Sequence, residues 1–172
     1  MNSPLPDELW EHIRSDRKIR MATAERSHEW FFSLYLGDYM VYPTAPFQQE
    51  IFGLTEDPTV NHAVIVAFRG SGKSTIVTMS YPIWAILGKQ QKKFVLILSQ
   101  TQNQARMHLA NIKREFESNE ILRADYGPLE ESSDEWGSTS LVLSRYGARI
   151  SAASTDQSIR GIRHGKHRPD LI

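Results

Sequence analysis

The most informative motif of the sequence lies in residues 62–75, His62-Ala-Val-Ile-Val-Ala-Phe-Arg-Gly-Ser-Gly-Lys-Ser-Thr75. An apolar run, Ala63 to Phe68, stops at the polar segment Arg69-Gly70-Ser71-Gly72-Lys73-Ser74-Thr75, and sequence compatible with a helix follows. This order predicts a buried strand, a phosphate-binding loop and a helix, which is the context that the loop motif requires. Ala67 stands where the strict motif has its first glycine, so the match is to a relaxed pattern.

The residue types in this loop match the tasks of phosphate binding. Successive backbone N–H groups can form a concavity that attracts anions, and the following helix points its positive end at the same place. Gly70 and Gly72 allow backbone turns that a Cβ would obstruct. Lys73 would reach the β- and γ-phosphates of ATP, Ser74 would ligate Mg²⁺, and Thr75 would lie near the α-phosphate. The alternative is a glycine-rich turn that carries one solvated lysine.

A second candidate element lies upstream of the loop. Residues 46 to 53 predict a short helix, with a proline at its first position and a glycine at its end. Phe47 could supply an apolar contact to adenine, and the amide of Gln48 could pair with the N6/N7 edge of the base. The alternative is that Phe47 belongs to the core and Gln48 to the surface.

The composition is that of a globular protein without covalent cross-links. Hydrophobic residues make up 40% of the 172 residues and charged residues 23%, which is enough apolar sequence for one sizeable core. The sequence has no cysteine, so disulfides and thiolate metal sites are excluded. No apolar run approaches the ~20 residues of a membrane span, and the first residues lack the basic-then-apolar order of a signal peptide. We therefore expect a protein of a reducing cytoplasm, without a membrane partner.

The charges balance overall but are unevenly distributed. The formal net charge is 0. From residue 145 to the end, six Lys/Arg and two Asp/Glu give a local net charge of +4. From residue 115 to 135, eight acids and one arginine give a local net charge of −7, and residues 117 to 137 are expected to form a surface excursion. Each segment could be an ordinary solvated face.

The remaining pattern alternates helices with apolar strands. Residues 7–20 and 24–36 predict helices, and 74–87 predict a helix that Pro82 should end or kink. Residues 94–98 form a continuous apolar run, typical of a buried parallel strand. Thr101 could cap the next helix, whose apolar face would be Ala105, Leu109, Ile112 and Phe116. Residues 141–144 and 148–151 predict a β-hairpin, and 170–172 predict the start of another strand.

In this order, the pieces resemble the ATPase domain of the large terminase subunit of tailed bacteriophages. The resemblance covers about residues 28 to 172 and is carried by an ordered series of short motifs. The motifs are Phe47-Gln48, the loop with Arg69 before its glycines, Ser99-Gln100-Thr101, Gln104-Ala105, Trp136 near a hairpin, Arg160-Gly161-Ile162-Arg163 and Arg168-Pro169-Asp170-Leu171-Ile172. The loop alone would fit many unrelated families, whereas the series is much more specific.

For the fold, the resemblance implies an α/β P-loop NTPase of the ASCE type, with a parallel sheet flanked by helices, an N-terminal helical arm and an inserted β-hairpin. Residues 1–58 would form the arm and the adenine-side segment, and residues 59–172 the ATPase core. In that family the segment 168–172 leads into a Walker B strand with an acidic pair, which would begin just after Ile172. The chain is thus expected to be the N-terminal part of a longer motor, able to bind nucleotide but poor at hydrolysing it.

For function, the resemblance implies an ATP hydrolase that drives double-stranded DNA into a procapsid, with ATP and Mg²⁺ as cofactors. Its partners would be DNA, the portal protein, the small terminase subunit and copies of itself in a ring, expected to be a pentamer, in the host cytoplasm at the portal. Lys73 and Arg69 would contact the γ-phosphate in cis, and Arg160 or Arg163 of a ring neighbour would act as an arginine finger. The alternative is that these arginines are surface cations.

Two further functions remain open. A helicase-like DNA translocase would contain similar strands and would be expected to carry stacking aromatic residues in loops at the carboxyl end of the sheet. A domain that binds nucleotide or a partner without turnover would need only the phosphate-binding elements.

Overall fold

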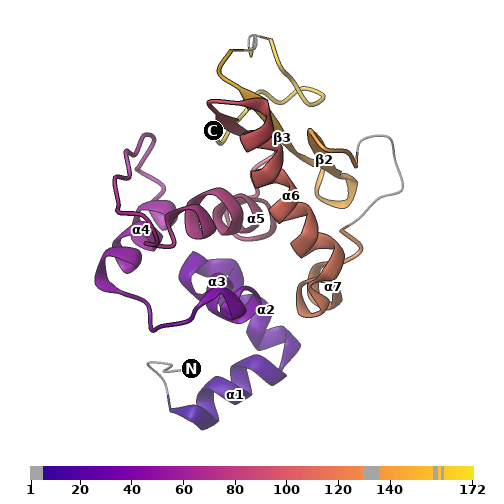
Figure 1. Ribbon diagram of the computed structural model, residues 1–172. Helices are drawn as coiled ribbons and strands as arrows, with labels where there is room; N and C mark the ends of the chain where they lie inside the picture. Colours follow the sequence, from indigo (N-terminus) through magenta and orange to yellow (C-terminus); the bar gives the residue numbers. More distant parts are fainter. Residues whose placement is uncertain (1–5, 130–135, 157–158, 160) are drawn as a thin grey trace. The chain divides into compact units, whose positions relative to one another are not determined.

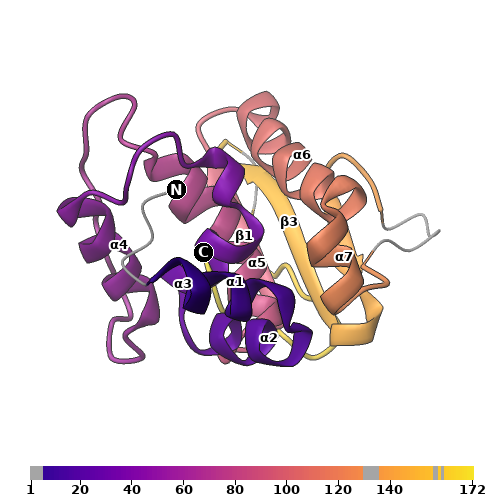
Figure 2. The same cartoon turned by 90° about the horizontal axis from the view of Figure 1, so that it is seen from below.

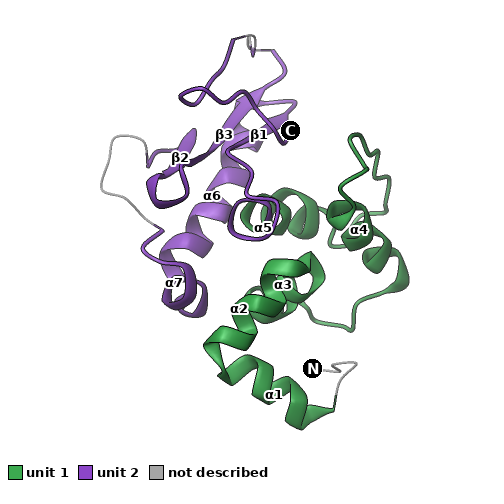
Figure 3. Cartoon of the chain, turned by 180° about the vertical axis from the view of Figure 1, so that it is seen from behind, with its two compact units in different colours: residues 1–84 green, residues 85–172 purple. Residues whose placement is uncertain are grey.

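The computed structural model describes residues 6–129, 136–156, 159 and 161–172. The chain divides into two compact units, residues 1–84 and residues 85–172 (Figure 3). The division falls within the helix α5 (Tyr81–Leu87). The domain boundary predicted after residue 58 stays a prediction.

The described part of unit 1 consists of short helices and their connections (Figure 1). They are α1 (Asp7–Ser15), α2 (Arg17–Arg26), α3 (His28–Tyr35), the 3-10 helix η1 (Gly37–Tyr39), α4 (Pro46–Glu56) and the π-helix η2 (Ser74–Ser80). Side-chain caps explain why α1, α2 and α3 replace the two longer helices predicted over 7–20 and 24–36. The Asp16 carboxylate accepts the N–H groups that open α2, and Ser27 Oγ accepts the N–H of Trp30 in α3.

The core of unit 1 contains a fully buried histidine. His28 in α3 is 0% exposed, and its ring centroid lies 4.9 Å from that of Phe52 and 5.3 Å from that of Trp84. Trp84 is also 0% exposed, and its Nε1–H donates to the carbonyl of Ala24 at 2.9 Å. Aromatic packing and one indole hydrogen bond thus join α2, α3, α4 and the start of α5.

The hydrogen bonds of His28 define its tautomer. Nδ1 lies 2.7 Å from Thr55 Oγ1, and Nε2 lies 2.9 Å from Ser80 Oγ. Thr55 Oγ1 donates its own proton to the carbonyl of Phe52, so it accepts from His28, and Nδ1 therefore carries the ring proton. Nε2 is then the acceptor for Ser80. Burial lowers the pKa of His28 from 6.5 to about 3, so the ring is neutral in the folded protein.

The apolar run before the loop is not a strand, and the prediction of a buried strand at Ala63–Phe68 is wrong in this structure. Residues 60–68 have no regular secondary structure. Val64 is 92% exposed, Val66 90% and Phe68 67%. A parallel strand is buried only between neighbours that accept its backbone and cover both faces. Among the described residues no strand pairs with this segment, so Val64, Val66 and Phe68 stay largely exposed.

The helix after the loop changes type at Pro82. The helical run extends through η2 into α5, and the π geometry ends immediately before Tyr81, whose N–H donates to the carbonyl of Ile76, five residues earlier. Proline has no N–H to give, and in an α-helix its ring clashes with the carbonyl four residues back. The wider π turn separates these groups, so Pro82 marks a change of geometry within the predicted helix rather than its end.

Unit 2 contains a small mixed sheet. Its elements after α5 are β1 (Phe94–Ser99), α6 (Gln102–Ser118), α7 (Glu120–Tyr126), β2 (Ser140–Leu143), the 3-10 helix η3 (Ser144–Tyr146) and β3 (Ala148–Ser154). The strand order is β1-β3-β2, with β1 and β3 parallel and β2 and β3 antiparallel. The register pairs Phe94 with Arg149 and Ser99 with Ser154. The fold is therefore mixed α/β, and the expected parallel sheet is seen in part, as the β1–β3 pair.

Local chemistry accounts for these elements. Thr101 caps α6 by accepting the N–H of Gln104, and the helix packs on β3 and β1 (Figure 2). The predicted face Ala105, Leu109, Ile112 and Phe116 is buried. The predicted hairpin is also confirmed; Gly147 closes its turn at a φ of +57°, a left-handed conformation that favours glycine. In contrast, α7 lies inside the segment predicted as a surface excursion, and it buries Leu122 and Tyr126.

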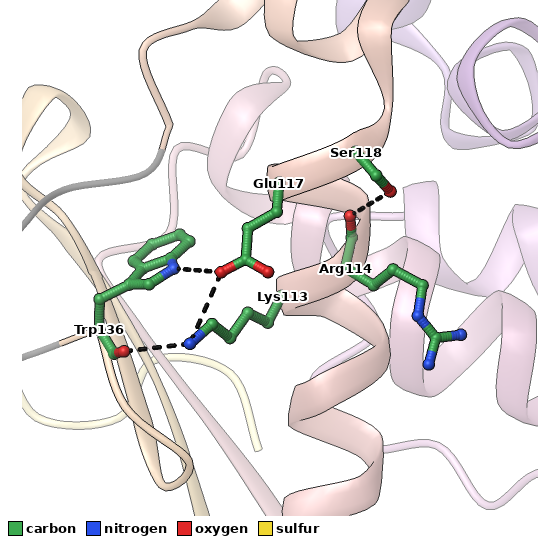
Figure 4. Close-up of polar contacts among 5 residues, drawn as sticks. All are labelled: Lys113, Arg114, Glu117, Ser118 and Trp136. Atoms are coloured by element: carbon green, nitrogen blue, oxygen red, sulfur yellow. Dashed lines mark hydrogen bonds and ion pairs between the residues drawn. The ribbon is translucent and has the colours of Figure 1, made fainter.

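Side-chain contacts attach two later segments to unit 2. The indole N–H of Trp136 donates to Glu117 Oε1 at 2.9 Å, and Lys113 Nζ donates to the carbonyl of Trp136 at 3.2 Å (Figure 4). The two carboxylate oxygens of Asp170 accept the N–H groups of Lys93 and Phe94 at 2.9 and 2.8 Å. Asp170 thereby fixes the C-terminal segment beside β1, where Leu171 forms one parallel bridge with Val95. The strand predicted at residues 170–172 is seen as this single bridge.

We expect stability to fall as the pH drops below 6.5, where His28 is protonated in the unfolded chain but not in the folded one. The pKa of His28 is depressed in the folded state. The stability that depends on its neutral ring is therefore complete above pH 6.5 and is lost progressively as the pH falls toward 3. One proton corresponds to a slope of about 1.4 kcal/mol per pH unit. Urea unfolding between about pH 6.5 and 5.5, chosen to lie above most carboxylate titration, measures the slope.

The informative variant is His28→Gln, which should be less stable at neutral pH and should have a flatter profile. His108→Gln is the matched control, because burial lowers the pKa of His108 as well but that ring is only half-buried. If the free energy of unfolding had the same pH slope in the wild-type protein and in His28→Gln, the pH dependence could not be assigned to His28.

Candidate functional site

The loop between Phe68 and η2 has two glycines in left-handed conformations. Gly70 has a φ of +85° and Gly72 a φ of +78°, and Ser71 stands between them. The N–H of Ser71 donates to the carbonyl of Phe68 at 3.3 Å, which closes the turn, and the carbonyl of Gly72 accepts the first helical N–H, that of Ile76, at 3.0 Å. Alternation of left-handed residues with others turns successive N–H groups toward a common side, the geometry of anion-binding backbone concavities.

The predicted phosphate-binding side chains follow this turn directly. Ser71 is buried, with 4% of its surface exposed, and its Oγ lies 3.4 Å from the N–H of Lys73. Lys73 and Thr75 are half-buried and Ser74 is exposed, all three at the start of the helical run. The structure thus collects the predicted residues 69–75 in one turn and the first helical residues after it.

Two positively charged side chains, Arg69 and Lys73, flank the glycine turn. In the described part of the chain, neither Lys73 nor Arg69 forms an ion pair with a carboxylate. Arg69 is exposed. Two cations beside a row of backbone donors make this turn electropositive, which suits an anionic ligand with several oxygen atoms.

The first turn of α4 contacts the loop before its first glycine and again between its two glycines. The ring of Phe47 meets that of Phe68 edge-on, with 5.5 Å between centroids. Gln48 Nε2 donates to the carbonyl of Ser71 at 2.9 Å, and its Oε1 accepts the N–H of Ala45 at 2.9 Å. Both Phe47 and Gln48 are half-buried, so neither is simply a core or a surface residue. The structure therefore brings both predicted base-side residues to the glycine turn that is predicted to bind phosphate.

Sequence reasoning missed the contact between Gln48 and the loop backbone. The local half of the arrangement was detectable, because glutamine at the third helical position commonly accepts the N–H of the capping residue. The other half joins residues 23 apart and depends on how α4 packs, which no short motif encodes.

The predicted arginine-finger candidates are less well defined. Arg163 lies in unit 2 and is exposed, whereas the loop belongs to unit 1. Arg160 lies outside the described residues. Both assignments stay predictions.

The metal assignment rests on Ser74 alone. Among the described residues, no group of three or more His, Asp or Glu side chains is placed to hold a metal ion. The hydroxyl of Ser74 lies on an exposed residue immediately after Lys73. Mg²⁺ commonly takes few protein ligands and completes its shell with phosphate oxygens and water, so this donor fits a nucleotide-bound Mg²⁺ rather than an all-protein site.

Comparisons with protein-family models, with curated proteins and with solved structures found no match for this chain. In its described residues, no helix has both the length and the apolar character needed to cross a membrane.

Two glycine substitutions should have opposite effects on the free energy of unfolding. Gly72→Ala places a Cβ at a φ of +78° and 3.0 Å from Gln48 Nε2, which should destabilise the protein by about 1–2 kcal/mol. Gly53 lies inside α4, where an added Cβ meets nothing within 4 Å, so Gly53→Ala should stabilise by about 0.5–1 kcal/mol. Chemical denaturation measures both, and a Gly72→Ala variant as stable as wild type would show that the loop does not require its left-handed glycine.

Proposed function

We propose that the chain binds Mg-ATP at residues 69–75 and serves as the nucleotide-binding part of a DNA-packaging motor of the terminase large-subunit type. The observation that carries the proposal is the turn itself. Two left-handed glycines flank the buried Ser71 and are followed directly by Lys73 at the start of a helical run. The turn combines backbone N–H donors, the start of a helix and the ammonium of Lys73, which has no carboxylate partner among the described residues. A polyphosphate requires this chemistry.

Each residue of the site has a role in this proposal. Lys73 would neutralise charge on the β- and γ-phosphates and stabilise the charge that shifts during phosphoryl transfer. Ser74 would ligate Mg²⁺ and Thr75 would lie near the α-phosphate. Arg69, which is exposed before the first glycine, would contact the γ-phosphate. Ser74 would hold the Mg²⁺ of the bound nucleotide, which would supply Lewis-acid stabilisation of phosphate charge.

The first turn of α4 suits a base-binding role beside this site. Gln48 uses one amide proton and one oxygen lone pair in its contacts with Ser71 and Ala45. An amide has two donors and two acceptor positions, so one of each remains, enough for a two-hydrogen-bond contact with the N6/N7 edge of adenine. Phe47 would supply the apolar surface beside the base.

The motor assignment rests on the ordered motifs of the sequence. In this proposal the chain is part of an α/β P-loop NTPase whose ring neighbours supply Arg160 or Arg163 in trans, and ATP hydrolysis moves double-stranded DNA through a portal. DNA contacts would be mainly to phosphates, because a packaging motor must accept any sequence. The basic segment from residue 145 to the end, with its net charge of +4, has the sign that such contacts need.

Replacement of the loop lysine tests the nucleotide site. Lys73→Ala should abolish detectable binding of Mg-ATP and Mg-ADP, because it removes the one lysine of residues 69–75, and Arg69 precedes the glycines instead of following them. Calorimetric titration of both proteins measures the change. Lys18→Ala, which removes an exposed lysine from α2, is the matched control. Equal affinity in wild type and Lys73→Ala would remove the assignment.

Duplex DNA separates the motor from a domain that only binds nucleotide. The motor proposal expects two duplexes of equal length and unrelated sequence to bind equally well. Binding should weaken by about tenfold or more between about 50 and 200 mM salt, as counterion release requires. Fluorescence anisotropy measures both effects. Absence of binding, or a strong sequence preference, would contradict the motor and leave the nucleotide site untouched.

A further inference from the structure

We propose that Gln48 is a positioning residue that sets the conformation of the phosphate-binding turn before any nucleotide arrives. The inference rests on the proposed nucleotide site and assigns to Gln48 a task that does not involve the base. Its amide would hold one peptide group of the turn in the orientation that phosphate binding needs.

The contact joins a helix to the most constrained part of the turn. Gln48 Nε2 donates to the carbonyl of Ser71 at 2.9 Å, and Ser71 is flanked by the two left-handed glycines. A Cβ on Gly72 would stand 3.0 Å from the same Nε2, so the amide lies directly against the turn. A side chain at position 72 would make the amide shift by a few tenths of an ångström, and the φ of +78° is itself one that L side chains rarely adopt.

The geometry of the peptide bond transmits this contact to a phosphate donor. The carbonyl of Ser71 and the N–H of Gly72 belong to one planar trans peptide, in which the two groups point in opposite directions. Fixing the carbonyl on Gln48 therefore fixes the Gly72 N–H on the side away from α4. Glycine is the residue type whose backbone rotates most freely, so without a partner for the carbonyl this peptide could turn over and withdraw a donor from the site.

Gln48 is itself held in place. Its Oε1 accepts the N–H of Ala45 at 2.9 Å across the first turn of α4, which restricts the side chain before the loop is reached. The contact of Phe47 with Phe68 ties the same helical turn to the entrance of the loop. The amide thus presents its donor from a supported position, and little rotamer freedom remains to be lost when the ligand binds.

A ligand without a base distinguishes this role from adenine recognition. The probes are inorganic tripolyphosphate, ATP and GTP, each with Mg²⁺, titrated calorimetrically into wild-type protein and three variants. Gln48→Ala removes the donor. Gln48→Glu keeps an acceptor for Ala45 but places a second oxygen against the Ser71 carbonyl. Gln49→Ala is the matched control, an exposed glutamine at the next position of α4.

The expected result is that Gln48→Ala weakens tripolyphosphate binding by about 5- to 30-fold, the effect of one lost hydrogen bond in a polar turn. ATP and GTP should weaken by at least the same factor, Gln48→Glu should be at least as weak, and Gln49→Ala should bind all three ligands like wild type. A larger loss for ATP than for GTP would add base recognition to the positioning role. Thermal unfolding followed by circular dichroism verifies that each variant is folded under the conditions of the titration.

Other outcomes overturn the inference in distinct ways. If Gln48→Ala weakens ATP alone and leaves tripolyphosphate unchanged, Gln48 reads the base and does not position the turn. If Gln48→Glu binds tripolyphosphate like wild type, the donor to Ser71 is not needed. If wild-type protein binds neither tripolyphosphate nor ATP, the nucleotide site itself is wrong, which the Lys73→Ala titration shows independently.

Discussion

The arrangement of unit 1 depends on one constraint, that the buried ring of His28 must have a partner at each nitrogen. Thr55 supplies one partner from α4, and Ser80 supplies the other from the end of η2. The same two elements carry the candidate site, because α4 begins with Phe47 and Gln48 and η2 begins just after Lys73. An unpaired polar group in such a core costs about 1–3 kcal/mol, so the histidine holds the two elements in a defined relation. The loop is thus fixed from a distance by a residue that touches no part of it.

Much of the fold was predictable because its signals are local. Proline at the start of α4 and threonine at the cap of α6 each act within a few residues, and the sequence predicts both. The apolar runs that became β1 and the buried face of α6 follow simple periods. α7 was missed because acidic neighbours concealed Leu122 and Tyr126, an apolar pair four residues apart on one helical face.

The wrong strand at residues 63–68 and the missed contact between Gln48 and Ser71 share a physical cause, since both depend on residues that are distant in the sequence. Residues 63–68 have the composition of a buried strand, but burial needs neighbours that composition cannot supply. The π geometry before Pro82 reflects backbone crowding over a whole turn. Within the site, glycine and lysine spacing predicted residues 69–75, whereas the contact from Gln48 to Ser71 required the packing of α4 to be known.

The exposed segment before the loop also affects how this chain behaves at high concentration. Val64, Val66 and Phe68 are three large apolar side chains that lie exposed on a segment without regular secondary structure. Exposed apolar side chains on backbone that pairs with no described strand can drive association between separate molecules and lead to aggregates. A net charge of zero does little to keep such molecules apart, so a charged side chain at position 64 or 66 should reduce their association.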